Sequence, residues 1–276
     1  MNKNKRVVVG MSGGVDSSVT ALLLKQQGYD VVGLFMRNWE YGIKGSQCPN
    51  RIEFEDAKKV GALIGIEVIG KDFVKEYRDR VFDVFLDGLK QGLTPNPDIL
   101  CNKEIKFNVF LNEAKKMGAD MIATGHYAKI AKYKDHFVLD TPKDSSKDQT
   151  YFLHALSSEQ LSHAMFPLGD LTKKEVREIA RAHNLPVSDK KDSTGICFIG
   201  NQKFDEFITQ HLQAIPGDIL DENGKVIGKH KGLVCYTLGQ RKGIGLGGIK
   251  GNENENNTHK PWFVAAKDVI NNTLTI

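Results

Sequence analysis

A glycine loop between a short apolar run and a helix-like segment constrains the fold more than any other feature of the sequence. Residues Arg6–Gly10 (RVVVG) form a β-branched run, which predicts a strand. Apolar side chains then recur at helical spacing within Ser17–Gln27. The loop that joins the two contains Gly13 and Gly14. A strand, a glycine loop and a helix in this order are typical of the first unit of a parallel α/β sheet.

The same alternation continues along the chain. Further strands are predicted at Asp30–Met36, Glu67–Ile69 and Met121–Thr124, and further helices at Arg51–Ile64, Phe73–Leu89 and Asn108–Lys116. This pattern predicts an α/β fold in which helices cover both faces of a parallel sheet. Ligands in such folds bind at the carboxyl ends of the strands. We therefore expect Gly10–Ser17, Met36 and Gly125–His126 to lie on one rim.

The character of the sequence changes in its last quarter. Two more helices are predicted before that point, at Tyr151–Met165 and Lys173–Asn184. Beyond them, Asn223-Gly224 forms a turn signal between short β-like runs, and PWFVAA and NNTLTI read as short strands. We predict a catalytic domain over residues 1–209 and a small β-rich domain over residues 210–276.

Composition and charge leave many function classes open. The chain has 276 residues, of which 40% are hydrophobic and 26% charged, which is typical of a globular protein. The net charge of +4 permits a polyanionic partner without requiring one. Residues 225–250 contain six Lys or Arg and no Asp or Glu, so this stretch is either a solvated loop or a phosphate-contacting surface. No targeting segment and no apolar run near about 20 residues is seen, so we expect a cytoplasmic protein without membrane partners.

The glycine loop has the chemistry of an anion site. Gly13 and Gly14 can adopt backbone angles closed to other residues, so that successive N–H groups face one anion at the start of a helix. Asp16 could cap that helix or help to hold Mg²⁺. The loop lacks the lysine of a Walker A motif, which favours gripping a pyrophosphate that leaves over γ-phosphate transfer. A plain strand–helix turn would not need this set of glycines, serines and an aspartate.

Two of the four cysteines lie in polar, motif-like surroundings, and no CxxC pair predicts a metal site. Cys101 follows Asp98 by one helical turn if a helix begins there, and nearby lysines would lower its pKa. Alternatively, Asp98 caps the helix and Cys101 packs in the core. Cys197 lies on the polar loop KDSTGICF, where it is either an accessible thiol or a half-buried side chain without a role.

The motifs together resemble a known family. SGGVDSS resembles the signature of PP-loop ATP pyrophosphatases, which adenylate a carbonyl-type oxygen and then displace AMP with a nucleophile. NPDILCNKEIKF, TGHYAKI, KDQTYFL, FPLGDLTKKEVREIA, KDSTGICFIG and TLGQRKGIGLGG resemble the tRNA-specific 2-thiouridylase family over the whole chain. The resemblance implies a PP-loop fold and an ATP-dependent sulfurtransferase, which replaces the C2 oxygen of the wobble uridine of tRNA by sulfur.

The resemblance also implies roles for particular residues. ATP, with Mg²⁺, would be held by Gly10, Met11, Ser12, Gly13, Gly14, Val15, Asp16, Ser17, Met36 and Gly125. The flipped target base would contact Asn96, Pro97 and Asp98, with Asp98 as a plausible acid or base, and tRNA would contact His126, Lys147, Asp148 and Gln149. Cys197 would carry the sulfur as a persulfide, and Cys101 would act as the second thiol, able to form a disulfide with Cys197. The sulfur would come from a donor protein, either a cysteine desulfurase or a relay carrier.

Family members normally continue into a C-terminal β-barrel domain, whereas this chain stops about where that domain would begin. We therefore expect weakened tRNA affinity with the catalytic motifs intact. Two other functions remain open. A PP-loop amidating ligase would use ammonia and need no cysteine pair. A catalytically dead tRNA-binding module would bind RNA with steep salt dependence and release no pyrophosphate.

Overall fold

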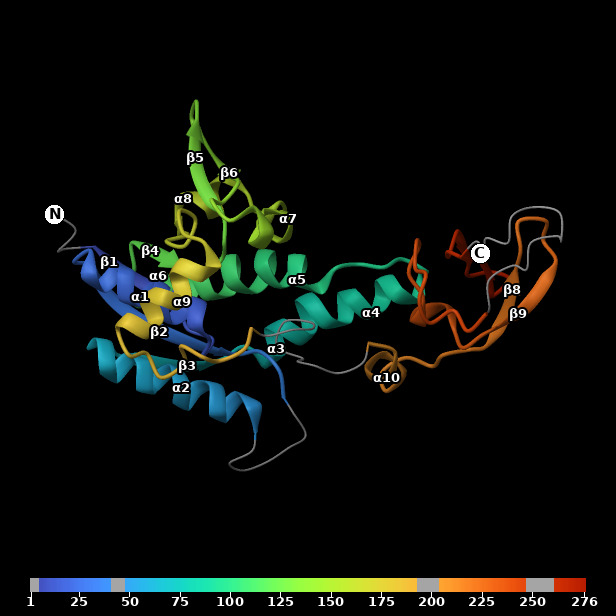
Figure 1. The fold of residues 1–276 in the computed structure, drawn as a ribbon, viewed down its shortest axis with the longest axis horizontal. Helices are drawn as coiled ribbons and strands as arrows, with labels where there is room; N and C mark the ends of the chain where they lie inside the picture. Colours follow the sequence, from blue (N-terminus) through green and yellow to red (C-terminus); the bar gives the residue numbers. More distant parts are fainter. Residues whose placement is uncertain (1–4, 41–47, 193–203, 247–260) are drawn as a thin grey trace. The chain divides into compact units, whose positions relative to one another are not determined.

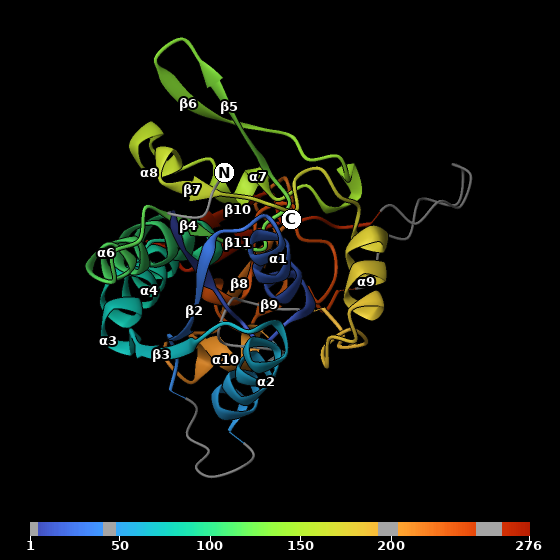
Figure 2. The ribbon, with the colours of Figure 1, turned by 90° about the vertical axis from the view of Figure 1, so that its left-hand side faces the viewer.

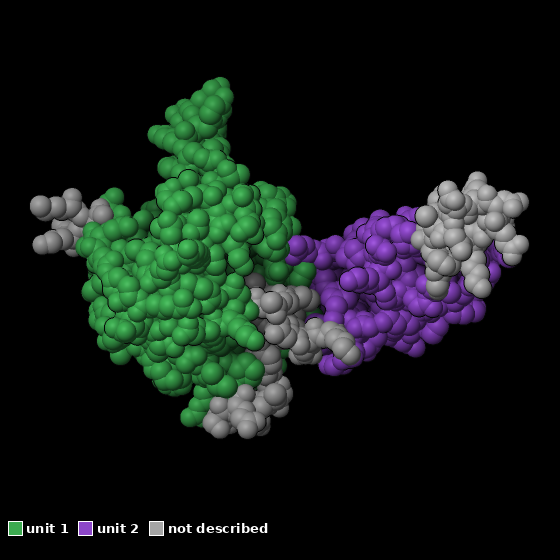
Figure 3. Space-filling model, in the orientation of Figure 1, with its two compact units in different colours: residues 1–82, 97–201 green, residues 83–96, 202–276 purple. Residues whose placement is uncertain are grey.

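The computed structural model describes residues 5–40, 48–192, 204–246 and 261–276 (Figure 1). The chain forms two compact units, which we describe separately (Figure 3). Unit 1 contains residues 1–82 and 97–201, and unit 2 contains residues 83–96 and 202–276. A segment from the middle of the sequence thus belongs to the same unit as the C-terminal part. The predicted domain division near residue 210 stays a prediction.

Unit 1 is built on a five-stranded parallel sheet. Its strands, in the order β3-β2-β1-β4-β7, are β3 (Val68–Asp72), β2 (Asp30–Arg37), β1 (Arg6–Gly10), β4 (Met121–Ala123) and β7 (Ala164–Met165). The β-branched run of β1 is central, with Val7 paired to Val31 on one side and to Met121 on the other. Val7, Val8 and Val9 are fully buried, as expected of a strand covered on both faces. The strand order reverses direction between β1 and β4, and the carboxyl ends of strands at such a reversal are where ligands bind in folds of this kind.

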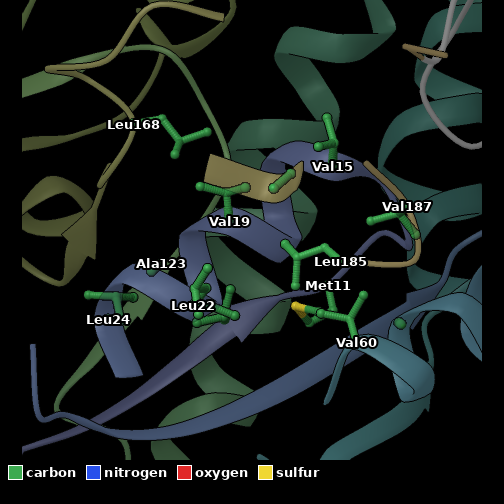
Figure 4. Close-up of a cluster of buried hydrophobic side chains, with 14 of the residues drawn as sticks. Met11, Val15, Val19, Leu22, Leu24, Val60, Ala123, Leu168, Leu185 and Val187 are labelled. Atoms are coloured by element: carbon green, nitrogen blue, oxygen red, sulfur yellow. The ribbon is translucent and has the colours of Figure 1, made fainter. Parts of the chain in front are cut away.

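Helices cover both faces of this sheet, which confirms the predicted α/β fold. Figure 2 shows α1 (Val15–Gln26), α2 (Pro49–Ile64) and α9 (Lys173–Ala182) on one side, with α3 (Val74–Tyr77) and α6 (Phe110–Lys116) on the other. Met11, Val19 and Val60 pack in the core between the first group and the sheet (Figure 4). This core positions the start of α1 at the carboxyl edge of β1.

The predicted helices are found, but several are divided. The predicted helix at 73–89 consists of α3, η1 (Arg78–Phe82), a short π-helical stretch, and α4 (Asp83–Lys90). The helix predicted from Asn108 begins earlier, as α5 (Pro97–Leu100) and η2 (Cys101–Val109) lead into α6. The predicted helix Tyr151–Met165 was wrong as one element: it contains α7 (Thr150–Leu153), α8 (Ser158–Ser162) and strand β7. The break has a local cause, because Ser157 and Gln160 form a capping box that starts a new helix.

A hairpin between β4 and α7 was not predicted. It consists of β5 (Lys129–Tyr133) and β6 (His136–Asp140), which pair antiparallel, and η3 (Ser145–Lys147) follows as a 3₁₀ turn. The turn residue Lys134 has a positive φ of 53°, a conformation that glycine or asparagine usually signals. The charged sequence KYKDH therefore concealed the turn.

Unit 2 is a small β-rich unit, and a small β-rich part of the chain was predicted after the α/β part. Its elements are α4, α10 (Phe204–Thr209), β8 (Gly217–Leu220), β9 (Val226–His230), η4 (Leu233–Cys235), β10 (Ala266–Asp268) and β11 (Thr273–Thr275). The strands form a sheet in the order β10-β11-β8-β9. Ile219 and Leu274 are fully buried in its core. In neither unit does the described part of the chain include a helix with the length and apolar character needed to cross a membrane.

Candidate functional site

The glycine loop leaves the sheet at the carboxyl end of β1. The backbone N–H of Met11 still donates to the carbonyl of Leu34 on β2, at 2.9 Å, and the chain then turns away. Gly13 has a φ of +73°, and a Cβ at this position would overlap the backbone of Glu53 on α2. Both the backbone angle and the lack of space therefore require glycine at this position.

The serines of the loop bind within the loop itself. Ser17 Oγ accepts from the N–H of Ser12 at 3.2 Å and lies 3.2 Å from Ser12 Oγ. Ser17 and Ser18 also donate to the carbonyl of Gly14, at 3.2 and 2.8 Å. No side chain caps the start of α1. The first-turn N–H groups, which lack partners inside any helix, therefore face the loop at the positive end of the helix dipole.

The predicted rim residues meet around this loop. A Cβ on Gly10 would lie 3.5 Å from the Cε of Met36 and 3.8 Å from the carbonyl of Ala123. A Cβ on Gly125 would lie 2.9 Å from the N–H nitrogen of Ser17, so the chain after β4 passes directly against the start of α1. The structure thus brings Gly10, Met36 and Gly125 to the same carboxyl edge.

Asp16, on the first turn of α1, does not cap that helix. Its Oδ1 accepts from the hydroxyl of Tyr127 at 3.0 Å, and both carboxylate oxygens accept from Lys173 Nζ, at 2.7 and 2.8 Å. Burial, followed by the charge of Asp16, raises the pKa of Tyr127, so its hydroxyl remains a donor. Lys173 thus brings a positive charge to a loop that has no lysine of its own.

The network around Lys173 extends to Asp192. Lys173 Nζ lies 2.8 Å from Asp192 Oδ1, and Asp192 also pairs with Arg177 at 2.8 Å and with Lys147 at 3.1 Å. Partial burial disfavours the charged carboxylate, but Lys173 and Lys147 outweigh it and lower the pKa of Asp192. Lys147, which the family resemblance implies to contact tRNA, forms an ion pair with Asp192.

The other residues predicted to contact tRNA are held from within unit 1. His126 lies 2.7 Å from Thr124 Oγ1 through Nδ1 and packs against the rings of Phe107 and Phe166. Burial, with a smaller contribution from Lys106, lowers the pKa of His126 well below 6.5, so the ring is neutral at neutral pH.

Asp148 and Gln149 are engaged in local hydrogen bonds. Asp148 accepts from the backbone and hydroxyl of Thr150, at 2.9 and 2.7 Å. The amide oxygen of Gln149 accepts from the N–H of Tyr127 at 3.0 Å. Gln149 thereby holds the backbone of Tyr127, whose hydroxyl donates to Asp16. Their predicted contacts with tRNA stay predictions.

The NPDILC segment begins a helix, as predicted. Pro97 and Asp98 lie in the first turn of α5, and Asn96 precedes it as an exposed residue. Cys101 is fully buried at the start of η2. This burial agrees with the packing interpretation of Cys101 and does not test its role as a thiol nucleophile. Cys197 lies outside the described residues.

Sequence reasoning missed the residues that surround the loop from later parts of the chain. Tyr127, Lys173, Lys190 and Asp192 all contact the loop or its partners. Lys173 had a usable signal, because Thr172 and Glu175 form a capping box that places Lys173 at the first position of α9. Asn38, directly after β2, is also a surprise: it is fully buried, and neither amide atom has a hydrogen-bond partner among the described residues.

The fold and the loop define a class, an α/β protein with a glycine loop and a helix start at the point where the strand order of its parallel sheet reverses. A family model described as "tRNA methyl transferase HUP domain" matches residues 5–201, and one described as "tRNA methyl transferase PRC-barrel domain" matches residues 205–276. The chain is 96% identical over its whole length to tRNA-specific 2-thiouridylase MnmA 2 of Aliarcobacter butzleri, and it spans 75% of that protein. It is 53% identical to the MnmA protein of Methylobacillus flagellatus, covering 99% of this chain and 74% of that one. The chain belongs to the tRNA-specific 2-thiouridylase family.

Solved structures show weaker similarity. An NMN synthetase from Francisella tularensis matches with a TM-score of 0.43 and 16% identity, covering 74% of this chain and 72% of that chain. A 4-thiouridine synthetase in an RNA complex with bound ATP matches with a TM-score of 0.44 and 14% identity, covering 75% of this chain and 50% of that chain. These similarities are too low to add to the argument.

Proposed function

We propose that this chain is a tRNA uridine 2-sulfurtransferase that uses ATP to activate the C2 oxygen of the wobble uridine. The identity of 96% to a protein named as a 2-thiouridylase supports this most strongly. The site agrees with it, because the tight turn at Gly13 and the uncapped start of α1 lie where the strand order of the sheet reverses. The proposed place of action is the cytoplasm, with tRNA and a sulfur donor protein as partners.

ATP is proposed to bind along the rim. The phosphates would lie on the first-turn N–H groups of α1, where the helix dipole favours negative charge. The exposed Ser12 adds a hydroxyl donor. Gly10 is proposed to contact the nucleotide beside Met36, and Gly125 beside the start of α1, against which its backbone passes directly. The remaining contacts come from Met11, Gly13, Gly14, Val15, Asp16 and Ser17.

The chemistry proposed for the loop is release of pyrophosphate. The C2 oxygen of uridine is a poor leaving group. Attack of that oxygen on the α-phosphorus of ATP forms a new P–O bond and breaks the bond to pyrophosphate. The oxygen then leaves with AMP when a nucleophile adds to C2. The uncapped start of α1 stabilises the negative charge that develops on the departing pyrophosphate.

The sulfur transfer is proposed to use both motif cysteines. The terminal sulfur of a Cys197 persulfide attacks C2, and AMP leaves with the original oxygen. The thiolate of Cys101 then attacks the Cys197 sulfur of the remaining S–S bond. The bond to the transferred sulfur breaks, 2-thiouridine is released, and the two cysteines are left as a disulfide. An external thiol reductant must restore both thiols before the next cycle.

The base contacts are also proposals. The target uridine must leave its stack to reach the site. Asn96, Pro97 and Asp98, where the chain enters α5, are proposed to contact it, with Asp98 as acid or base. Lys147, Asp148, Gln149 and the neutral His126 are proposed to contact the surrounding tRNA.

Mg²⁺ stays part of the proposal only as an ion that accompanies ATP. Among the described residues, no group of three or more His, Cys, Asp or Glu side chains is arranged to hold a metal. Both oxygens of Asp16 are occupied by Lys173. The described side chains do not fit a protein-held Mg²⁺ site, and no step above depends on one.

The test is a reconstitution. The chain is incubated with ATP, Mg²⁺, unmodified tRNA and a persulfide donor, and the digested RNA is examined by mass spectrometry. We expect 2-thiouridine, its loss in Cys197→Ser, and its retention in the control Cys48→Ser. A methylated uridine, as the name of the family model would suggest, has a different mass and would contradict the proposal. ATP cleavage that continues in Cys197→Ser with ammonia incorporated instead would favour an amidating ligase.

A further inference from the structure

Residues 188–192 follow α9 and precede Cys197 in the sequence. Hydrogen bonds hold them to α9 and to the glycine loop. Val187, just before them, is buried in the same core as Val15 and Val19 of α1 (Figure 4). Arg177 on α9 donates to the carbonyls of Ser188 and Lys190, both at 3.1 Å, and to Asp192 Oδ1 at 2.8 Å. One guanidinium therefore holds the whole stretch, which we call the 188–192 segment.

A first link joins this segment to the glycine loop. Lys190 Nζ donates to the backbone carbonyl of Gly13 at 3.0 Å and to Asp56 Oδ2 on α2 at 3.0 Å. Gly13 is the residue whose conformation defines the loop. A movement of the loop that displaces this carbonyl therefore acts directly on Lys190.

A second link runs through Lys173. An ammonium group has three N–H donors. Lys173 lies within 2.8 Å of three carboxylate oxygens, the two of Asp16 and Oδ1 of Asp192. Its side chain is 12% exposed, so solvent competes little for these contacts. All three donors are engaged, which makes Lys173 a bridge between the loop and the 188–192 segment.

We propose that Lys173 and Lys190 are positioning residues that couple nucleotide binding at the glycine loop to the 188–192 segment, which precedes Cys197 in the sequence. Asp192 is the last described residue before Cys197, so the two links act on the point where that part of the chain begins. Phosphate groups entering the loop compete with the Asp16 carboxylate and the Gly13 carbonyl for the ammonium groups of Lys173 and Lys190. The 188–192 segment transmits this change. The inference rests on the proposed function, because it assumes ATP at the loop and sulfur on Cys197.

The chain offers a matched control for each lysine. Lys174 neighbours Lys173 but is 86% exposed, and within the described part of the chain it forms a long ion pair of 3.9 Å with Glu178 of the same helix. Lys191 neighbours Lys190 and is exposed. Lys173→Met and Lys190→Met are therefore compared with Lys174→Met and Lys191→Met in the full chain. Lys173→Arg keeps the charge but changes the donor geometry.

The experiment measures the alkylation rate of Cys197 by peptide mass spectrometry, with and without α,β-methylene ATP, which cannot release pyrophosphate. In the wild-type chain and both controls, we expect the nucleotide to change this rate. In Lys173→Met and Lys190→Met, we expect that response to disappear and 2-thiouridine formed per AMP to fall by about 10²-fold, since small misplacements of a reacting group cost this much. We expect partial recovery in Lys173→Arg.

The outcomes separate the two proposals. Absence of 2-thiouridine from the wild-type chain would overturn the proposed function. The coupling would be overturned if the wild-type chain formed 2-thiouridine while the nucleotide left the alkylation rate of Cys197 unchanged. It would also be overturned if both lysine variants responded to the nucleotide as the wild type does. If Lys173→Met fails to fold by thermal melting, Lys190→Met decides, because the Lys190 side chain is 35% exposed and tolerates truncation better.

Discussion

The glycine loop and the Cys101 segment, both in unit 1, differ in how far their structure depends on local contacts. The turn of the loop is formed by short-range hydrogen bonds, as Ser17 binds Ser12 and Ser18 binds Gly14, and Lys173 and Lys190 reach it from later in the chain. The Cys101 segment depends on distant parts of the chain, since Asn102 reaches the carbonyl of Phe152 at 3.0 Å. A structure formed by contacts close in sequence can be predicted from a short motif. A structure formed by contacts between distant residues can be recognised only once the fold is known. The predictions below test this difference.

The largest effect is expected for Cys101→Ser. If Cys101 resolves the sulfur bond, this variant still forms AMP and pyrophosphate but releases no 2-thiouridine, because the hydroxyl cannot take over the S–S bond. AMP and modified nucleoside are measured in the same reaction. Cys235→Ser is the control, since Cys235 is also buried but lies in unit 2. Undiminished 2-thiouridine in Cys101→Ser would reduce Cys101 to a packing residue.

Gly13→Ala should damage the loop next most. Alanine meets both the positive φ and the backbone of Glu53, so the loop must move. We expect AMP formation to fall by about 10²-fold, as for other misplacements of reacting groups. Gly28→Ala provides the matched control, because Gly28 shares the positive φ, at 84°, and has nothing within 4 Å of its Cβ position. Equal losses in both variants would show that strain alone, rather than the close approach, matters.

Asn102→Ala should weaken the nonlocal region. Asn102 is 2% exposed, and its removal leaves the Phe152 carbonyl without this donor. The expected cost is about 1–3 kcal/mol in the free energy of unfolding, measured by urea denaturation. Asn112→Ala serves as comparison, because Asn112 is exposed and its side chain donates to Asn108, four residues earlier in the chain. If Asn102→Ala lowered the free energy of unfolding no more than Asn112→Ala, the Asn102 amide would not anchor the Cys101 segment.

The smallest effect concerns the start of α9, which delivers Lys173. Thr172→Ala should lower stability by about 1 kcal/mol through loss of the capping box. Lys143, and then Thr172, lower the pKa of Glu175 from 4.5 to about 2. The stabilisation from this carboxylate is therefore complete above about pH 4.5 and is lost as the pH falls toward 2. Melting curves across this range should converge for wild type and Glu175→Gln at the acid end.

The sequence predicted what depends on local pattern. Val7–Val9 as a buried strand, the loop at Gly13 and the rim with Met36 and Gly125 all follow from short motifs and the rule for parallel sheets. It did not predict the β5–β6 hairpin, because a lysine occupies the positive-φ turn position. Nor did it predict that Asp16 binds Lys173, since that contact joins residues far apart in the chain. Charged partners of this kind are set by tertiary packing alone.

Activation of the uridine C2 oxygen by ATP is the central claim, and an isotope label tests it most directly. A tRNA carrying heavy oxygen at C2 of the wobble uridine is thiolated by the chain, and the AMP formed is examined by mass spectrometry. The account predicts that the heavy oxygen appears in the phosphate of AMP, one atom for each 2-thiouridine formed. Formation of 2-thiouridine with unlabelled AMP would contradict it.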